Sequence, residues 1–293
     1  MNAPTSDTEL QLTPEQRLAI ATTKATCPFV GCAIVGGLLP VRNAVDAPLA
    51  SIADLTKLGN VANGDLGIVF TMFAQGNHTA LRTMGGNSET MPMGLFSLDF
   101  PSSQGVHPGD SGILMGDPPR TPPFRFHPEN FDRLTRRAID QRLTRRMIGD
   151  FIAENAQRDG KTVTLGHNHA IRAAEDLFGV LEALVPAGVS AVASAKAEVD
   201  KAHRQATQRL TKLLGEDHLV ASAGEFGLLF ALIGRPANAG EDDGPVLNVA
   251  EVRAMFEDKQ LPADWDRTPK STRQWAGHTF AIAFHAYKHF FFT

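Results

Sequence analysis

The stretch TPEQRLAIATTKATCPFVGCAIVGGL, Thr13–Leu38, predicts two consecutive helices that meet at a sharp turn. Thr13 is a residue that caps the first amides of a helix, and Pro14 suits the first helical position, where no N–H donor is needed. We therefore expect the first helix to begin at this pair and to run to about Thr26.

The pair Cys27-Pro28 repeats this start signal and predicts a second helix over Phe29–Leu38. Cys27 then lies at or beside the N-terminus of that helix, where unpaired amides stabilise negative charge and favour a thiolate. The simpler alternative is that Cys27 is a small buried residue in a helical turn. Spacing alone does not choose between the two.

Helical periodicity dominates the rest of the chain. Apolar residues recur at steps of three and four from Asn130 to Ala156, which predicts one long amphipathic helix with a break near Gly149. Strand signals are few and short. Further helices are expected at about 48–58, 64–75, 167–185, 188–214, 224–233 and 248–258.

These patterns predict an all-α fold in a single domain, 1–293, with a long irregular loop at Met84–Pro123. Residues 1–12 are expected to be a flexible N-terminus, and residues 266–293 a C-terminal extension. The aromatic residues at the end of that extension are expected to dock on the domain or on a second subunit, which leaves a homo-oligomer open.

Charge and cysteine content exclude several classes of protein. The 28 Lys and Arg residues against 32 Asp and Glu give a net charge of −4, so there is no electrostatic case for nucleic acid binding. Neither a secretory signal nor a membrane-spanning run is visible, and we expect a cytoplasmic protein. Cys27 and Cys32 are the only cysteines, five positions apart, which excludes a disulfide framework and the CxxC spacing of zinc sites.

Three blocks of sequence follow one another along the chain: CPFVGCAIVGGLLP (27–40), MGD (115–117) with FHPENFD (126–132), and AGEFGLLF (223–230) with the 249–256 segment and LP (261–262). Together they span most of the chain, although each alone is a weak signal. The three blocks resemble heme-thiolate haloperoxidases and unspecific peroxygenases, the chloroperoxidase-like family. Thr26 stands where that family usually has a proline, and Gly36 where it has a histidine.

The resemblance implies a chloroperoxidase-like helical fold around heme b, with Cys27, followed by Pro28, as the proximal ligand of the iron. It also implies that Glu225 is the distal acid-base, which takes a proton from hydrogen peroxide and returns it to the departing oxygen. The surrounding sequence agrees, because a carboxylate within the apolar run Leu219–Ile233 is desolvated and its pKa raised. The alternative is that Glu225 caps or pairs on a solvated helix face.

Two histidines are candidates to orient Glu225. His218 lies seven residues before it, at the place of an arginine in peroxygenases, and His107 lies in a loop that resembles the family's metal-binding loop. We favour His107, and a solvated or core histidine is the alternative for both.

The same loop departs from the family at its acidic metal ligands. Val106 and Pro108 occupy the two acidic positions, whereas magnesium and manganese require oxygen ligands. Either Asp110 and Ser111 compensate after a shift in register or the ion is absent. We therefore predict no metal site beyond the heme iron.

Apolar residues on two segments are candidates for a substrate pocket: Phe70, Phe73, Phe226 and Leu228. Leu228 lies one helical turn beyond the proposed acid. For each of them an ordinary core position is the alternative.

The sequence thus predicts a peroxidase or peroxygenase that uses hydrogen peroxide to oxidise or oxygenate a small organic substrate. Two alternatives remain. One is a non-catalytic heme-binding sensor or carrier in which Glu225 is incidental. The other is a heme-free helical interaction domain in which Cys27 belongs to the core.

Overall fold

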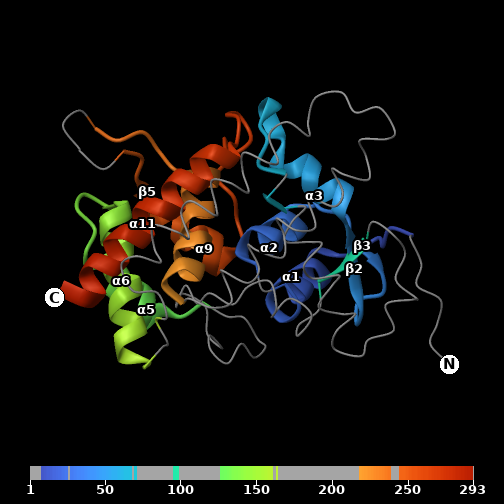
Figure 1. Ribbon diagram of the computed structural model, residues 1–293. Coiled ribbons are helices and arrows are strands. Elements are labelled where there is room, and N and C mark those ends of the chain that lie inside the picture. Colours follow the sequence, from blue (N-terminus) through green and yellow to red (C-terminus); the bar gives the residue numbers. More distant parts are fainter. Residues whose placement is uncertain are drawn as a thin grey trace, which may run out of the picture.

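The computed structural model describes residues 8–25, 27–67, 69–70, 95–98, 126–160, 163, 218–238 and 244–292 (Figure 1). Helices account for 59% of this part of the chain, and the strands form small sheets. The prediction of a helical fold is confirmed at this level, while the small sheets were not expected. None of the described helices is both long and apolar enough to span a membrane.

The described helices occur along the whole length of the chain. They are α1 (Pro14–Thr23), α2 (Pro28–Val35), α3 (Ile52–Gly59), η1 (Val61–Asn63), α5 (Pro128–Thr135), α6 (Arg145–Arg158), α9 (His218–Ile233), α10 (Val249–Arg253), η4 (Ala254–Asp258) and α11 (Thr272–Phe292).

Two short antiparallel sheets join distant segments. The first has the strand order β1 (Arg42–Asn43), β2 (Pro48–Ser51) and β3 (Leu95–Ser97). The second pairs β4 (Arg142–Leu143) with β5 (Leu247–Asn248). The β2–β3 and β4–β5 pairings hold together residues that are far apart in sequence, which is why no local pattern predicts them, whereas β1 and β2 are close neighbours along the chain.

The helix starts follow the capping signals of the sequence. The Thr13 hydroxyl accepts a hydrogen bond from the Gln16 amide at 3.3 Å, and the Gln16 side chain accepts one from the Thr13 amide at 2.9 Å. This capping box starts α1, and Pro28 starts α2 as predicted. At the other end of the chain, Asn248 caps α10, which was also expected.

The single long helix expected over 130–156 is wrong. The chain forms α5 and α6 instead, and the break lies between them rather than at Gly149. Asp140 and Gln141 have φ angles of 50° and 61°, which no α-helix accommodates, and Thr144 caps a new helix start.

The helix expected at 48–58 is also shorter than predicted. Residues 48–51 form β2 because they pair with β3, with Leu49 opposite Ser97. The Ser51 hydroxyl then accepts hydrogen bonds from the Ala53 and Asp54 amides and starts α3. A strand partner more than forty residues away overrides the local helical signal.

Helices α6, α9 and α11 pack closely enough to leave no room for side chains at two glycines (Figure 1). A Cβ atom on Gly227 of α9 would lie 2.9 Å from the Thr279 amide nitrogen of α11. One on Gly149 of α6 would lie 2.8 Å from the Ile282 carbonyl oxygen, also on α11. The indole of Trp275 donates to the Gly224 carbonyl at 3.1 Å across the α9–α11 contact.

The C-terminal residues are part of this core. Ile282 and Ala286 of α11 are fully buried, and Phe291 and Phe292 at its end are exposed. His278 is 8% exposed, and its ring centroid lies 5.4 Å from that of Phe230. Its Nδ1 atom has no hydrogen-bond partner among the described residues.

Two glycine substitutions test the α9–α11 contact. We expect Gly227→Ala to lower the free energy of unfolding by about 1–3 kcal/mol, because the new methyl meets Thr279. Gly277→Ala is the matched control on α11. Among the described residues, no atom outside its own helix backbone lies within 4 Å of its new methyl, so helix propensity should raise stability by about 0.5–1 kcal/mol. Urea unfolding measures both, and a Gly227→Ala protein as stable as the wild type contradicts this packing.

The burial of His278 leads us to expect that the free energy of unfolding falls in acid. Burial, reinforced by the positive charge of Arg145, lowers the pKa of His278 to about 4. In the unfolded chain a histidine titrates near 6.5, so between those values only the unfolded state holds the proton. Stability should therefore fall as the pH falls from about 6.5 to 4, by roughly 3 kcal/mol at most. His278→Leu should abolish that slope in urea unfolding, and His289→Gln on the same helix should retain it. An unchanged slope in His278→Leu would refute the assignment.

Candidate functional site

Cys27 is the N-cap residue of α2, as the sequence predicts. Its backbone is extended (φ −77°, ψ 120°), and Pro28 is the first helical residue. The side chain is half-buried and packs against the apolar core, and the carbonyl of Cys27 accepts the Gly31 amide at 3.0 Å. Cys27 thus lies at the positive end of a helix dipole, where a negative charge is favoured, and its side chain makes no capping hydrogen bond to the first amides of α2.

Cys32 has a different role from Cys27. It is buried, and its Sγ donates a hydrogen bond to the Met255 carbonyl oxygen at 3.3 Å. Burial raises the pKa of the Cys32 thiol to about 12, so it stays protonated. Five helical residues advance about 7.5 Å along the axis, which places the two cysteines beyond disulfide range. Neither cysteine forms a disulfide.

Glu225 lies in the middle of α9. Its side chain is the only half-buried one among the described residues from Ser222 to Ile233, all others of which are buried. The carboxylate is therefore neither on a broad solvated face nor fully sealed in the core. A half-buried carboxylate on an otherwise apolar helix has both solvent contact and an environment that a small molecule can share.

The side chains of both proposed partners of Glu225 lie outside the described part of the structure. His107 lies outside the described residues, together with the loop that carries Asp110 and Ser111. His218 is the first residue of α9, and the direction of its side chain is not described. Among the described residues, no group of three His, Cys, Asp or Glu side chains is arranged to hold a metal ion.

The predicted pocket residues are buried where the structure describes them. Phe70 stacks on Phe29 with ring centroids 4.9 Å apart, and Phe226 meets Phe151 of α6 edge-on at 6.5 Å. Leu228 is buried on α9, and Phe73 lies outside the described residues. Phe70 and Phe226 thus make core contacts, and a role for any of these residues in substrate binding stays a prediction.

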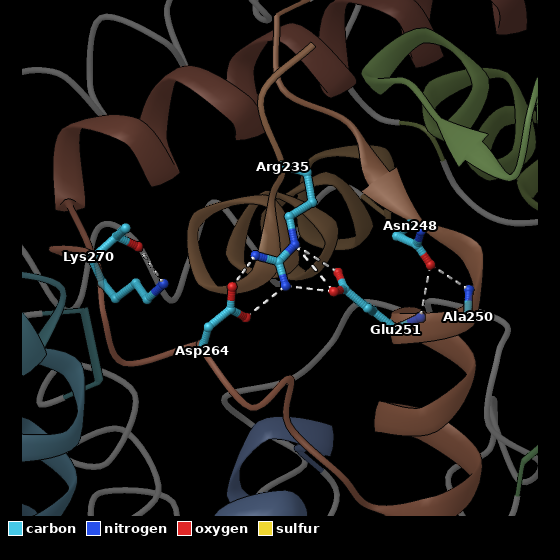
Figure 2. A network of polar contacts seen from close by, with 7 residues as sticks. Arg235, Asn248, Ala250, Glu251, Asp264 and Lys270 are labelled. Carbon is cyan, nitrogen blue, oxygen red and sulfur yellow. Dashed lines mark hydrogen bonds and ion pairs between the residues drawn. The ribbon is translucent and has the colours of Figure 1, made fainter. Parts of the chain in front are cut away.

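Arg235 joins the end of α9 to two later segments (Figure 2). Its guanidinium donates to the Glu251 carboxylate of α10 at 3.0 Å and to both oxygens of Asp264 at 2.8 Å. The hydrogen bonds from Arg235 hold the pKa of Asp264 at about 2, so the pair stays charged at neutral pH. Asn248 fixes Glu251 from the other side by capping α10.

Trp265, the residue after Asp264, connects the Arg235 network to α2. The indole of Trp265 packs edge-on against the ring of Phe29, with centroids 5.6 Å apart. Phe29 is two residues from Cys27. The C-terminal end of α9 and the first turn of α2 are therefore held by adjacent residues of one loop.

Sequence reasoning missed Arg235, Trp265 and the buried Lys259. Lys259 follows Phe256-Glu257-Asp258, which has the composition of a solvated charged turn, yet it is 3% exposed. Nothing local distinguishes these residues from surface residues, since their partners are distant in sequence.

Comparison of the chain with protein-family models, with curated proteins and with solved structures gave no match. The resemblance to heme-thiolate peroxidases thus rests on the residues quoted above. The Cys27 sulfur fits the ligand that heme iron needs in such proteins. It is half-buried at a helix N-terminus, a position suited to a thiolate ligand.

Arg235→Gln tests the network that joins α9 to α10 and the Asp264 loop. Removing the charge leaves Glu251 and Asp264 without their partner, so the free energy of unfolding should fall. Arg267→Gln, at an exposed position three residues after Asp264, should change it by less than about 0.5 kcal/mol. Equal stability of the two variants in urea unfolding would exclude a structural role for the bridge.

Proposed function

We propose that this protein is a heme-thiolate peroxidase or peroxygenase of chloroperoxidase-like fold, with Cys27 as the proximal ligand and Glu225 as the distal acid-base. The observation that supports it most is the position of Cys27 at the N-cap of α2, with Pro28 as the first helical residue. Heme b, when bound, supplies the reaction with hydrogen peroxide and the oxidation of a small organic substrate.

Cys27 would hold the iron through its sulfur. The amides at the start of α2 would stabilise part of the sulfur's negative charge, which tunes how strongly the ligand donates electrons. Cys32 cannot substitute for it, because its thiol is buried, protonated and bonded to the Met255 carbonyl.

Glu225 would move a proton at its carboxylate oxygens. The ionised carboxylate takes the proton from one oxygen of hydrogen peroxide and returns it to the oxygen that departs as water. Its half-buried position supports this role, because the group needs access to peroxide and partial shielding from bulk water. Neighbouring α9 residues are buried and would exclude water on that side.

The test is heme uptake and peroxide reactivity in matched variants. The wild type and Glu225→Gln should both bind one heme per chain in a hemin titration followed by absorbance. Glu225→Gln should then react with hydrogen peroxide about a hundredfold more slowly, because it has lost its general base.

Two controls complete this experiment. Cys27→Ser should lose the thiolate spectrum, while Cys32→Ser should retain it. Glu225→Gln with an unchanged peroxide rate would favour a heme sensor or carrier, and a wild type that binds no hemin would favour a heme-free helical domain.

A further inference from the structure

Helix α11 presents a row of exposed aromatic rings. Phe280, Phe284 and Phe291 are 43%, 55% and 49% exposed. At 3.6 residues per turn, their positions fall within about 40° of one another around the helix axis. Arg273 is also exposed and falls in the same sector. These four residues form one narrow line along the helix, which we call the α11 stripe.

The rest of α11 is fixed to the protein. Ile282 is buried, and the close approach of Gly149 on α6 and of Gly227 on α9 covers two sides of the helix. Near its C-terminal end, the Gln157 side chain of α6 donates to the Phe290 carbonyl at 3.3 Å. The stripe therefore belongs to an anchored helix, and little conformational freedom is lost when a partner covers it.

The composition and size of the stripe are those of an interaction surface. Three half-exposed phenylalanine rings present about 300 Å² of apolar surface to water. A contiguous apolar patch of this size often marks a binding surface, and aromatic residues and arginine are the types enriched at protein interfaces.

The order of the side chains makes the stripe complementary to itself. Phe280 and Phe284 lie two residues on either side of position 282, and Arg273 and Phe291 lie nine residues on either side of it. When two copies of α11 pack antiparallel about a twofold axis at this position, Phe280 of one copy faces Phe284 of the other. Arg273 of each copy then faces Phe291 of the other. Both pairings are attractive, the first between two rings and the second between a guanidinium and a ring.

We propose that the α11 stripe is the interface of a homodimer in which two copies of α11 pack antiparallel about position 282. A second copy of this chain is the partner because the stripe supplies both members of each pair. A parallel arrangement is excluded, since it places Arg273 beside Arg273 of the other copy, where the charges repel. The three rings of each copy supply only part of the roughly 1,200 Å² that stable complexes bury, so the dimer should dissociate on dilution. This proposal does not depend on heme binding.

Sedimentation equilibrium of the purified protein over a range of concentrations measures the dimer. The wild type should be a dimer at high concentration and a monomer on dilution. Phe284→Glu places a carboxylate against Phe280 of the other copy and should raise the dissociation constant about tenfold or more. Leu18→Glu is the matched control, because Leu18 is 46% exposed on α1, and it should leave the constant unchanged.

Two results of this experiment would overturn the proposal. One is a dimer that Phe284→Glu does not weaken. The other is a wild type that stays a monomer at every concentration, which would leave the stripe to residues 164–217 of the same chain or to a different protein. Phe280→Glu is a second variant of the stripe if Phe284→Glu fails to fold by circular dichroism.

A residue swap tests the antiparallel register. Phe291→Arg places two arginines opposite each other and should weaken the dimer about tenfold or more. Adding Arg273→Phe puts a guanidinium beside a ring again and should return the dissociation constant to near the wild-type value. A double variant as weak as Phe291→Arg alone would contradict this pairing and overturn the proposal.

Discussion

The fold depends on neighbouring helices that shield α9 from water, because α9 is apolar on nearly every side. Sixteen residues from His218 to Ile233 contain a single carboxylate, and such a helix is stable only when neighbouring helices surround it. Helix α11 approaches through Gly227, which admits no side chain, and the Trp275 indole satisfies the Gly224 carbonyl on the same face. Glu225 is the exception among the described residues from Ser222 to Ile233, because it is half-buried where the others are buried.

The burial of apolar side chains does not by itself fix the position of α9 relative to α2, the helix that Cys27 caps. The Arg235 guanidinium holds the end of α9 to Asp264, and the next residue, Trp265, packs on Phe29 near Cys27. A charged network and an aromatic contact on adjacent residues thus connect the two helices that carry the proposed ligand and acid. Charge-assisted bonds of fixed geometry suit this role better than apolar packing, which permits sliding.

The sequence predicts features that depend on neighbouring residues. Thr13 and Asn248 are recognised as caps because each bonds to amides two or three residues away, and the same logic finds Pro28 beside Cys27. Features that depend on distant partners are missed: residues 48–51 form a strand that pairs with β3, and the buried Lys259 side chain lies beside Gly31 of α2. The cysteine half of the candidate site is therefore more predictable than the surroundings of Glu225.

The central claim is that the Cys27 sulfur binds heme iron, and the absorption spectrum of the dithionite-reduced carbon monoxide complex tests it most directly. Protein expressed with a heme precursor should show a Soret band at the long-wavelength position typical of thiolate ligation, and the band should be lost in Cys27→Ser. A band at the shorter wavelength of imidazole ligation, or no heme spectrum after supplementation, would contradict the account.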